Sequence, residues 1–254
     1  MAKIALITGA TAGIGEACAY IFARNGYDLI LTGRRQDRLD ALAQQLNKDY
    51  NVRIAVAAFD IRNKEQVIHH LESLPDDLKK VDVLVNNAGL SQGLDPVQKG
   101  SYADWDTMID TNIKGLLYVS KVVSNWMVSN GYGHIVNLGS IAGKEVYANG
   151  NVYCATKAAV DALSKGMRID LLQHGIKVSA IHPGAVETEF SEVRFKGDKD
   201  RAKKVYEGFT PLTALDVAET IWFVVSRPAH VNINDLLLMP TAQATATLIN
   251  RKAD

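Results

Sequence analysis

Short apolar runs alternate along the chain with segments in which apolar residues recur at helical spacing. The short runs predict buried β-strands, because parallel strands that are covered on both faces lose the alternation of apolar and polar side chains. The predicted strands are Lys3–Thr8, Leu29–Thr32, Ile54–Phe59, Val81–Val85, Ile135–Leu138, Lys177–Ile181 and Asp235–Met239. The chain is therefore predicted to form an α/β fold.

Helices are predicted between these strands, where apolar residues return every three or four positions. They span Glu16–Asn25, Glu65–Leu74, Trp105 to about Asn130, Val152–His174 and Leu215–Ser226, and the apolar spacing Leu39, Leu42, Ala43, Leu46 marks another. Asn112 is unusual inside a long helix, because its side chain competes with the backbone for hydrogen bonds. We expect a kink there, with room for an ordered water.

The segment 185–210 is polar, rich in charge and poor in strand signal. It predicts one or two short helices that move over a site as a substrate lid. The alternative is a surface insertion without a role.

Three glycines follow the first predicted strand as Gly9-Ala-Thr-Ala-Gly13-Ile-Gly15, and a predicted helix follows them. In this context glycines permit a tight turn and let a pyrophosphate approach the helix N-terminus. The spacing differs from the G-x-G-x-x-G of the usual dinucleotide fingerprint. Alone, the turn is equally compatible with a purely structural role.

Arg34 and Arg35 stand after the second strand, where NAD-binding proteins place an acid for the ribose 2′-hydroxyl. Guanidinium groups suit a 2′-phosphate instead, so this position favours NADP over NAD. We expect Arg34 to contribute more than Arg35. The alternatives are that both arginines merely begin the next helix, and that Asp37 caps this helix or reaches the ribose.

Polar residues also follow two further strands. Asp60 and Ile61 suit an adenine amino group and ring, although Asp60 can instead cap the next helix. Asn87 and Gly89 belong to an Asn-Asn-Ala-Gly turn, which can hold a cofactor or simply stabilise itself.

A hydroxyl, a phenol and an ammonium come together around the fifth strand. Ser140 lies just beyond its end, where open α/β sheets bind their ligands. Tyr153 and Lys157 are four positions apart, so a helix places them on one face. An ammonium lowers the pKa of a neighbouring phenol, which suits proton transfer near neutral pH. The alternative is a packed aromatic ring beneath a lysine stem.

Composition narrows the class of protein. The 254 residues carry no net charge and no basic run, so nucleic-acid binding is not expected. The two cysteines, Cys18 and Cys154, indicate no disulfide framework, and the six histidines show no metal-ligand spacing. No signal peptide or membrane-spanning run is present in the sequence, so we expect a cytoplasmic protein without a membrane partner. We expect one domain over residues 1–254.

Taken together and in this order, the motifs TGATAGIG, NNAG, Asn112, Ser140, YCATK and HPG resemble the short-chain dehydrogenase/reductase family over nearly the whole chain. The resemblance implies a Rossmann-type, doubly wound, mostly parallel seven-stranded sheet with helices on both faces, and usually a homotetramer. Within the family, NVYCATKA, TEFSEVRFKGD and HVNINDLLLMP are similar to the NADP-dependent 3-hydroxy acid dehydrogenases.

The resemblance also implies roles for individual residues. Tyr153 is the acid/base, Lys157 lowers its pKa and binds the nicotinamide ribose, Ser140 polarises the substrate oxygen, and Asn112 holds a water. The implied NADP-binding residues are Gly9, Thr11, Gly13, Ile14, Gly15, Arg34, Arg35, Asp60, Ile61, Asn87, Gly89, Tyr153, Lys157, Pro183, Gly184 and Thr188. No metal is implied.

The resulting hypothesis is hydride transfer between NADP(H) and small 3-hydroxy acids such as L-serine or L-allo-threonine. Ser140 and Tyr153 would meet the substrate, and Arg194 or Lys196 is a candidate for its carboxylate, with simple solvent exposure as the alternative. A carbonyl or 3-oxoacyl reductase with a larger substrate is the second hypothesis. A non-catalytic NADP-binding sensor is the third, which an intact Ser, Tyr and Lys set disfavours.

Overall fold

A seven-stranded sheet with the strand order β3-β2-β1-β4-β5-β6-β7 forms the centre of the computed structural model, which describes residues 2–252. The strands are β1 Ile4–Thr8, β2 Asp28–Gly33, β3 Ile54–Ala58, β4 Val83–Asn86, β5 Gly133–Leu138, β6 Ile176–Pro183 and β7 Asp235–Leu238. All neighbouring strands are parallel, so the sheet is wholly rather than mostly parallel. The strand order reverses direction between β1 and β4, and this topology is the predicted doubly wound, Rossmann-type arrangement.

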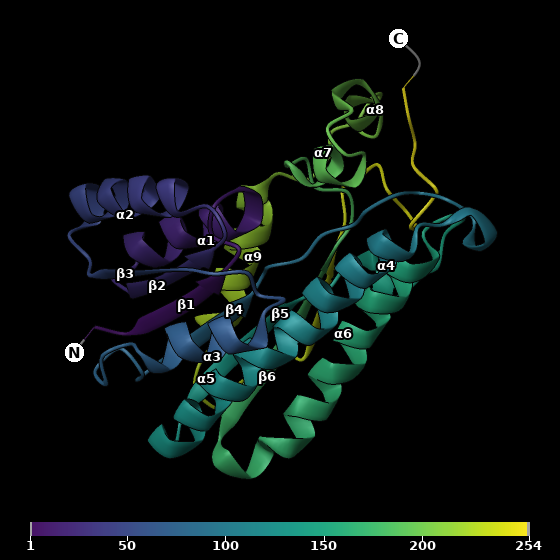
Figure 1. The fold of residues 1–254 in the computed structure, drawn as a ribbon. Coiled ribbons are helices and arrows are strands. Elements are labelled where there is room, and N and C mark those ends of the chain that lie inside the picture. The colour runs from purple at the N-terminus through teal and green to yellow at the C-terminus, as the bar shows by residue number, and fades with distance from the viewer. Residues whose placement is uncertain (1, 253–254) are drawn as a thin grey trace.

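Helices cover both faces of the sheet (Figure 1). Their bounds are α1 Gly13–Arg24, α2 Gln36–Tyr50, α3 Lys64–Glu72, α4 Tyr102–Ile109, α5 Leu116–Asn130, α6 Asn151–Asp170, α7 Phe190–Arg194, α8 Lys199–Lys204 and α9 Ala214–Val225. One face packs against α1, α2 and α9, and the other against α3, α5 and α6. Each covered face supplies a separate apolar core.

The surroundings of β1 on both faces of the sheet explain why its sequence lacks an alternating pattern. Ala5 and Ile7 pack into the core under α1 and α9, whereas Ile4 and Leu6 pack into the core under α3 and α5. All four side chains are buried. A strand with apolar neighbours on both faces needs apolar residues at every position.

The long helix predicted to begin at Trp105 is interrupted. Between α4 and α5 the chain forms one π-helical turn, Asp110–Gly115, which contains Asn112. Such turns widen a helix locally and are frequent at functional sites. The expected irregularity at Asn112 is therefore present, as a π turn.

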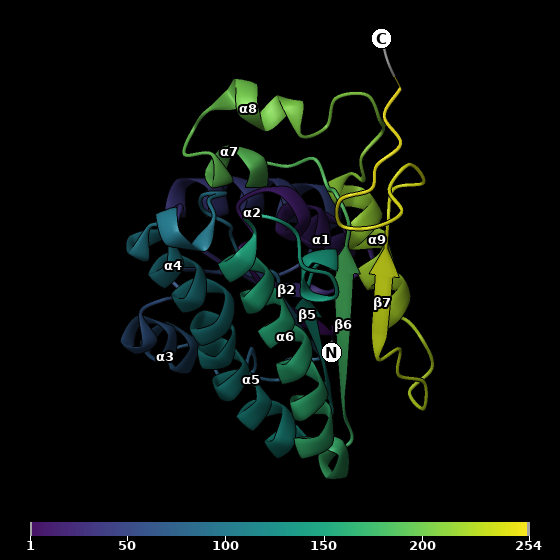
Figure 2. The ribbon, with the colours of Figure 1, turned by 90° about the vertical axis from the view of Figure 1, so that its right-hand side faces the viewer.

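Two short helices, α7 and α8, lie within the segment 185–210 and beyond the carboxyl ends of the strands (Figure 2). None of the helices in residues 2–252 is both long and apolar enough to cross a membrane.

Candidate active site

A cavity of about 280 Å³ opens at the carboxyl ends of the strands, where the strand order reverses. Most of the residues predicted to bind a cofactor or substrate line it: Gly9, Thr11, Gly13, Ile14, Arg34, Arg35, Asp60, Ile61, Asn87, Gly89, Ser140, Tyr153, Lys157, Pro183, Gly184 and Thr188. The predicted residues Gly15, Asn112 and Arg194 are not among the residues that line it. The structure thus brings together residues from distant parts of the sequence.

The glycine turn forms one wall of the cavity. Gly9 and Gly13 have φ angles of 67° and 58°, a left-handed conformation that side chains disfavour. A Cβ atom on Gly15 would lie 2.3 Å from the carbonyl oxygen of Gly9. The Asn87 amide donates to the carbonyls of Thr8, at 2.9 Å, and Gly9, at 3.1 Å. Asn87 thus holds the turn in place, and the backbone of the turn stays open to the cavity.

Arg34 and Arg35 lie at the same cavity but have different partners. The Arg35 guanidinium donates to the Thr11 hydroxyl at 2.9 Å and pairs with Glu189 at 3.0 Å. Arg34 is exposed and makes no hydrogen bond or ion pair with any residue from 2 to 252. The Arg34 side chain is therefore free to bind an anionic group.

Asp60 does not cap the helix that follows it. The N-cap of α3 is Asn63, whose side chain accepts from the backbone N–H of Gln66 at 2.9 Å. The Asp60 carboxylate instead binds the Arg62 guanidinium at 2.6 Å, and this hydrogen bond lowers the pKa of Asp60. Asp60 and Ile61 remain in the cavity wall.

Tyr153 lies inside the cavity with its side chain almost fully buried, 8% exposed. Burial raises the pKa of the phenol well above its ordinary value, while the Arg194 charge and the neighbouring Ser140 hydroxyl lower it. The Ser140 hydroxyl also accepts from the backbone N–H of Ala142 at 3.1 Å. A substrate oxygen placed here would meet both a phenol and a hydroxyl, because Tyr153 and Ser140 line the same cavity.

Lys157 is buried one helical turn beyond Tyr153 on α6. Its Nζ donates to the Leu138 carbonyl at 2.9 Å, at the end of β5. Burial lowers the pKa of this ammonium to about 8. The lysine can therefore gain or lose a proton near neutral pH, and it lies at the cavity wall.

Asn112 connects the π turn to the active-site helix. Its amide exchanges hydrogen bonds with the backbone of Leu90, at 2.8 and 2.9 Å, and donates to the Thr156 hydroxyl at 3.0 Å. Thr156 lies within the Tyr-x-x-x-Lys motif but was not singled out from the sequence. Thr156 is buried next to Lys157 in the sequence, so it belongs to the same candidate site.

The Arg194 side chain lies over the active-site aromatic rings. Its guanidinium carbon is 5.1 Å from the centre of the Tyr153 ring and 5.3 Å from that of Phe190. The guanidinium also donates to the hydroxyls of Ser91, at 3.0 Å, and Tyr147, at 2.7 Å. By contrast, Lys196 pairs with Asp104 at 2.9 Å. Of the two candidate cations, only Arg194 contacts Tyr153.

Besides Thr156, three residues of the site escaped the sequence prediction. Ser91 and Tyr147 contact Arg194, and Glu189 contacts Arg35. Each belongs to a loop or helix end far in sequence from its partner, so no local spacing reveals it. Of these three, only Tyr147 could have been suspected from the sequence, because it is an aromatic residue shortly before the Tyr153 motif.

The chain matches the family model described as short chain dehydrogenase over residues 3–199. Together with the fold and the cavity, this match establishes the class: the protein belongs to the short-chain dehydrogenase family, whose members are oxidoreductases.

Individual relatives resemble nearly the whole chain. The NADP-dependent 3-hydroxy acid dehydrogenase YdfG of Salmonella typhi is 49% identical over 246 residues, which cover 96% of this chain and 98% of that protein. Sulfoacetaldehyde reductase 2 of Chromohalobacter salexigens is 46% identical over 245 residues, 96% of each chain. The closed form of a serine dehydrogenase complexed with NADP+ superposes with a TM-score of 0.91 and 48% identity, covering 98% of this chain and 100% of the other.

Proposed function

We propose that this protein is an NADP-dependent oxidoreductase that transfers a hydride between NADP(H) and small 3-hydroxy acids such as L-serine or L-allo-threonine. The observation that carries the substrate class is the Arg194 guanidinium over the Tyr153 ring, 5.1 Å from its centre. A cation for the substrate's acid group would then lie next to the phenol that we propose handles the hydroxyl proton. The named activities of YdfG and of the serine dehydrogenase support the same assignment.

The cavity fits a dinucleotide in its shape and its charge. The backbone of Gly9 and Gly13 faces it without side chains, and the free Arg34 lies at its rim. We assign the pyrophosphate to Gly9, Thr11, Gly13, Ile14 and Gly15, and the 2′-phosphate to Arg34 and Arg35. We assign the adenine and both riboses to Asp60, Ile61, Asn87, Gly89, Tyr153 and Lys157, and the nicotinamide end to Pro183, Gly184 and Thr188.

The protein's part in the reaction is proton transfer and charge stabilisation. The cofactor, when bound, accepts or supplies the hydride. In the direction of oxidation, Tyr153 takes the proton from the substrate hydroxyl, while Ser140 hydrogen-bonds the same oxygen. The positive charge of Arg194 favours the phenolate form that must take this proton. We assign the same effect to Lys157. We assign to Asn112 a water that connects Lys157 to solvent.

An anion subsite next to the phenol would accept a sulfonate as well as a carboxylate. Arg194 donates to the hydroxyls of Ser91 and Tyr147, and its guanidinium retains further N–H donors, which suit either group. The similarity to a sulfoacetaldehyde reductase makes sulfoacetaldehyde a second candidate substrate. Arg194 would have the same role in both reactions.

The whole chain, residues 1–254, is proposed to act as one domain in which the segment 185–210 is the substrate lid. We further propose a cytoplasmic homotetramer. Exposed apolar residues along α4 and α5, Tyr102, Ile109 and Leu117, suit contacts between subunits. The free cysteines Cys18 and Cys154 suit a reducing compartment. Light scattering of the purified protein and cell fractionation test these two points.

The function is tested by following NADP reduction at the nicotinamide absorbance band. L-serine, L-allo-threonine, 3-hydroxypropionate and a plain secondary alcohol are compared, with NAD and with Tyr153→Phe as controls. Turnover of the acids with NADP, lost in Tyr153→Phe, is expected. Turnover of the plain alcohol alone would overturn the hydroxy-acid assignment. Tight NADP binding without any turnover, on this panel and on larger carbonyl compounds, would favour the sensor hypothesis.

A further inference from the structure

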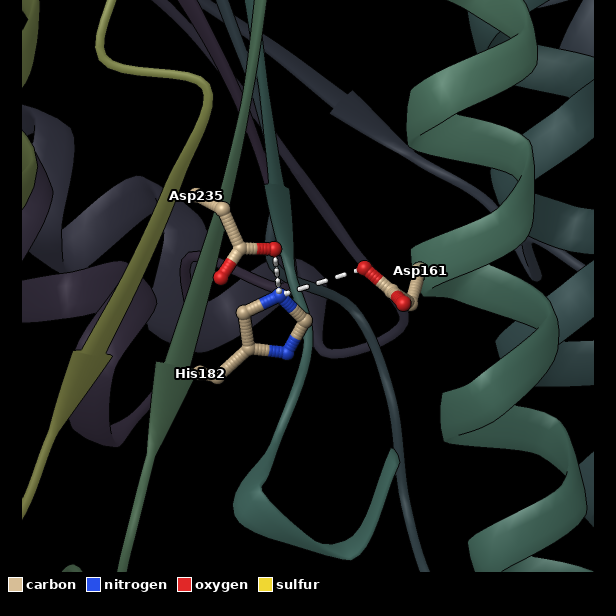
Figure 3. Close-up of side chains that lie close together, drawn as sticks. All are labelled: Asp161, His182 and Asp235. Atoms are coloured by element: carbon tan, nitrogen blue, oxygen red, sulfur yellow. Dashed lines mark hydrogen bonds and ion pairs between the residues drawn. The ribbon is translucent and has the colours of Figure 1, made fainter. Parts of the chain in front are cut away.

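A buried histidine lies directly behind Ser140. His182, near the end of β6, is fully buried, and its two ring nitrogens face oxygen atoms on opposite sides. Its Nδ1 is 3.3 Å from the Ser140 carbonyl oxygen. Its Nε2 is 3.1 Å from Oδ2 of Asp235 and 3.7 Å from Oδ1 of Asp161 (Figure 3). The ring therefore connects the backbone of Ser140 to a pair of carboxylates.

The same two carboxylate oxygens bind the ammonium of Lys144. Its Nζ lies 2.9 Å from Oδ1 of Asp161 and 2.7 Å from Oδ2 of Asp235. Asp161, His182 and Asp235 hold ligand atoms within 4.8 Å of one another, the spacing of a metal site. Because the lysine already supplies a cation to both acids, we interpret the group as an internal ion cluster of Lys144, Asp161, His182 and Asp235.

The position of this ion cluster relates it to the active site. Lys144 follows Ser140 by four residues, at the end of the 3-10 turn Ile141–Gly143. Asp161 follows Lys157 by four residues on α6 and so lies on the same face of that helix. The ion pair between Lys144 and Asp161 therefore joins the segment that carries Ser140 to the helix that carries Tyr153 and Lys157.

His182 fixes the same segment from beneath. A Cβ atom on Gly139 would lie 2.3 Å from Nδ1 of His182, so the ring is in close contact with the backbone next to Ser140. Because Gly139 has no side chain, His182 can approach and hydrogen-bond the Ser140 carbonyl. The segment is thus held on one side by β6 and on the other by α6.

We propose that Lys144, Asp161 and His182 are positioning residues, which set the separation between the Ser140 hydroxyl and the Tyr153 phenol. None of the three lines the cavity, so they act through Ser140 and α6 rather than by touching substrate or cofactor. Displacement of a catalytic group by about 1 Å can cost a factor of roughly 100 in rate. The inference rests on the proposed function only for the assay that measures this rate.

The test compares two lysines that bind the same acid. Lys144→Met removes the link between the Ser140 segment and α6. Lys165→Met is the matched control, because Lys165 binds Oδ2 of Asp161 at 2.9 Å from within α6. We expect Lys144→Met to lower kcat about tenfold or more with unchanged binding of NADPH, Lys165→Met to leave kcat within about twofold, and Lys144→Arg to recover most of the loss.

If Lys144 had a merely structural role, Lys144→Met would lower the melting temperature but leave kcat unchanged, and Lys144→Arg would have no loss of kcat to recover. This result would overturn the inference. Crystal structures of Lys144→Met and Lys165→Met provide a readout that needs no substrate. We expect the segment 140–144 to move relative to α6 in the first variant alone. Unchanged separation of Ser140 and Tyr153 in both variants would overturn the inference, whatever the substrate proves to be.

Discussion

Arg35 and Glu189 form an ion pair across the cavity, with Nη1 of the arginine 3.0 Å from Oε2 of the glutamate. Glu189 also binds Arg38 at 2.8 Å, and the arginine hydrogen bonds and charges lower its pKa. One carboxylate thus occupies two guanidinium groups beside the proposed 2′-phosphate site. An anionic cofactor and Glu189 would compete for Arg35.

Removal of the Glu189 carboxylate should strengthen the binding of NADP+. We expect Glu189→Gln to lower the dissociation constant for NADP+ by a factor of roughly 3–10 and to leave that for NAD+ nearly unchanged. Because the pair is partly exposed, with side chains 39% and 46% accessible, the effect should shrink as salt is added. Isothermal titration with both cofactors at low and high salt measures this. The exposed Glu192, on α7, provides the control Glu192→Gln.

The opposite sign would be equally informative. If Glu189→Gln weakened binding of both cofactors, the ion pair would be holding α7 over the bound dinucleotide. The hypothesis that Glu189 competes with the 2′-phosphate for Arg35 would then be wrong.

Arg34 should discriminate between the two cofactors. It has no partner among residues 2–252, so its whole donor set is available to a phosphate. We expect Arg34→Ala to weaken NADP+ binding by a factor of about 10–100, since hydrogen bonds to charged groups contribute about 1.5–3 kcal/mol. The NAD+ dissociation constant should change by less than about twofold. Equal losses for the two cofactors would remove the role of Arg34, and Arg24→Ala, at the end of α1, controls for lost surface charge.

Substitutions of Arg194 and Lys196 distinguish binding of the substrate carboxylate from a general effect of positive charge on the lid. We expect Arg194→Ala to raise KM for the 3-hydroxy acids about 10–100-fold, because a charge-assisted pair to the carboxylate is lost. Lys196→Ala, which removes a nearby cation bound to Asp104, should leave KM almost unchanged. Since the Arg194 charge also lowers the pKa of Tyr153, kcat for every substrate should fall somewhat.

A plain secondary alcohol distinguishes these two effects of Arg194. It has no acid group, so its KM should not respond to Arg194→Ala. Equal increases in KM for the alcohol and the acids would show that Arg194 shapes the cavity rather than binding a carboxylate.

Much of the fold could be predicted because it depends on local sequence. The glycine turn between β1 and α1 and the apolar run in β1 lie where the pattern indicated, since tight turns and two-sided burial impose strong local constraints. Element ends were less predictable. The helix predicted to reach His174 ends at Asp170, because Leu172–His174 tightens into a 3-10 turn before Gly175, whose φ is 68°.

The site residues could be predicted from motifs, whereas their supporting contacts could not. Ser140, Tyr153 and Lys157 come from one stretch of chain and line one cavity. The contacts of Glu189 with Arg35, and of Lys144 with Asp235, join residues 154 and 91 positions apart. Such pairs depend on how the strands are ordered, and no spacing within the sequence reveals them.

His134 should make the protein sensitive to mild acid. The ring is buried at the start of β5, with Nε2 2.8 Å from the Ser179 hydroxyl, and burial lowers its pKa to about 3. The unfolded chain binds a proton at His134 as the pH falls below about 6.5, whereas the native ring does not. The free energy of unfolding therefore decreases as the pH is lowered. Between pH 7 and 5 we expect this residue to account for a loss of about 2 kcal/mol. Gln can keep a hydrogen bond to Ser179 but does not titrate, so urea unfolding of His134→Gln should show a correspondingly smaller loss, and equal losses in both proteins would show that His134 does not cause the acid sensitivity.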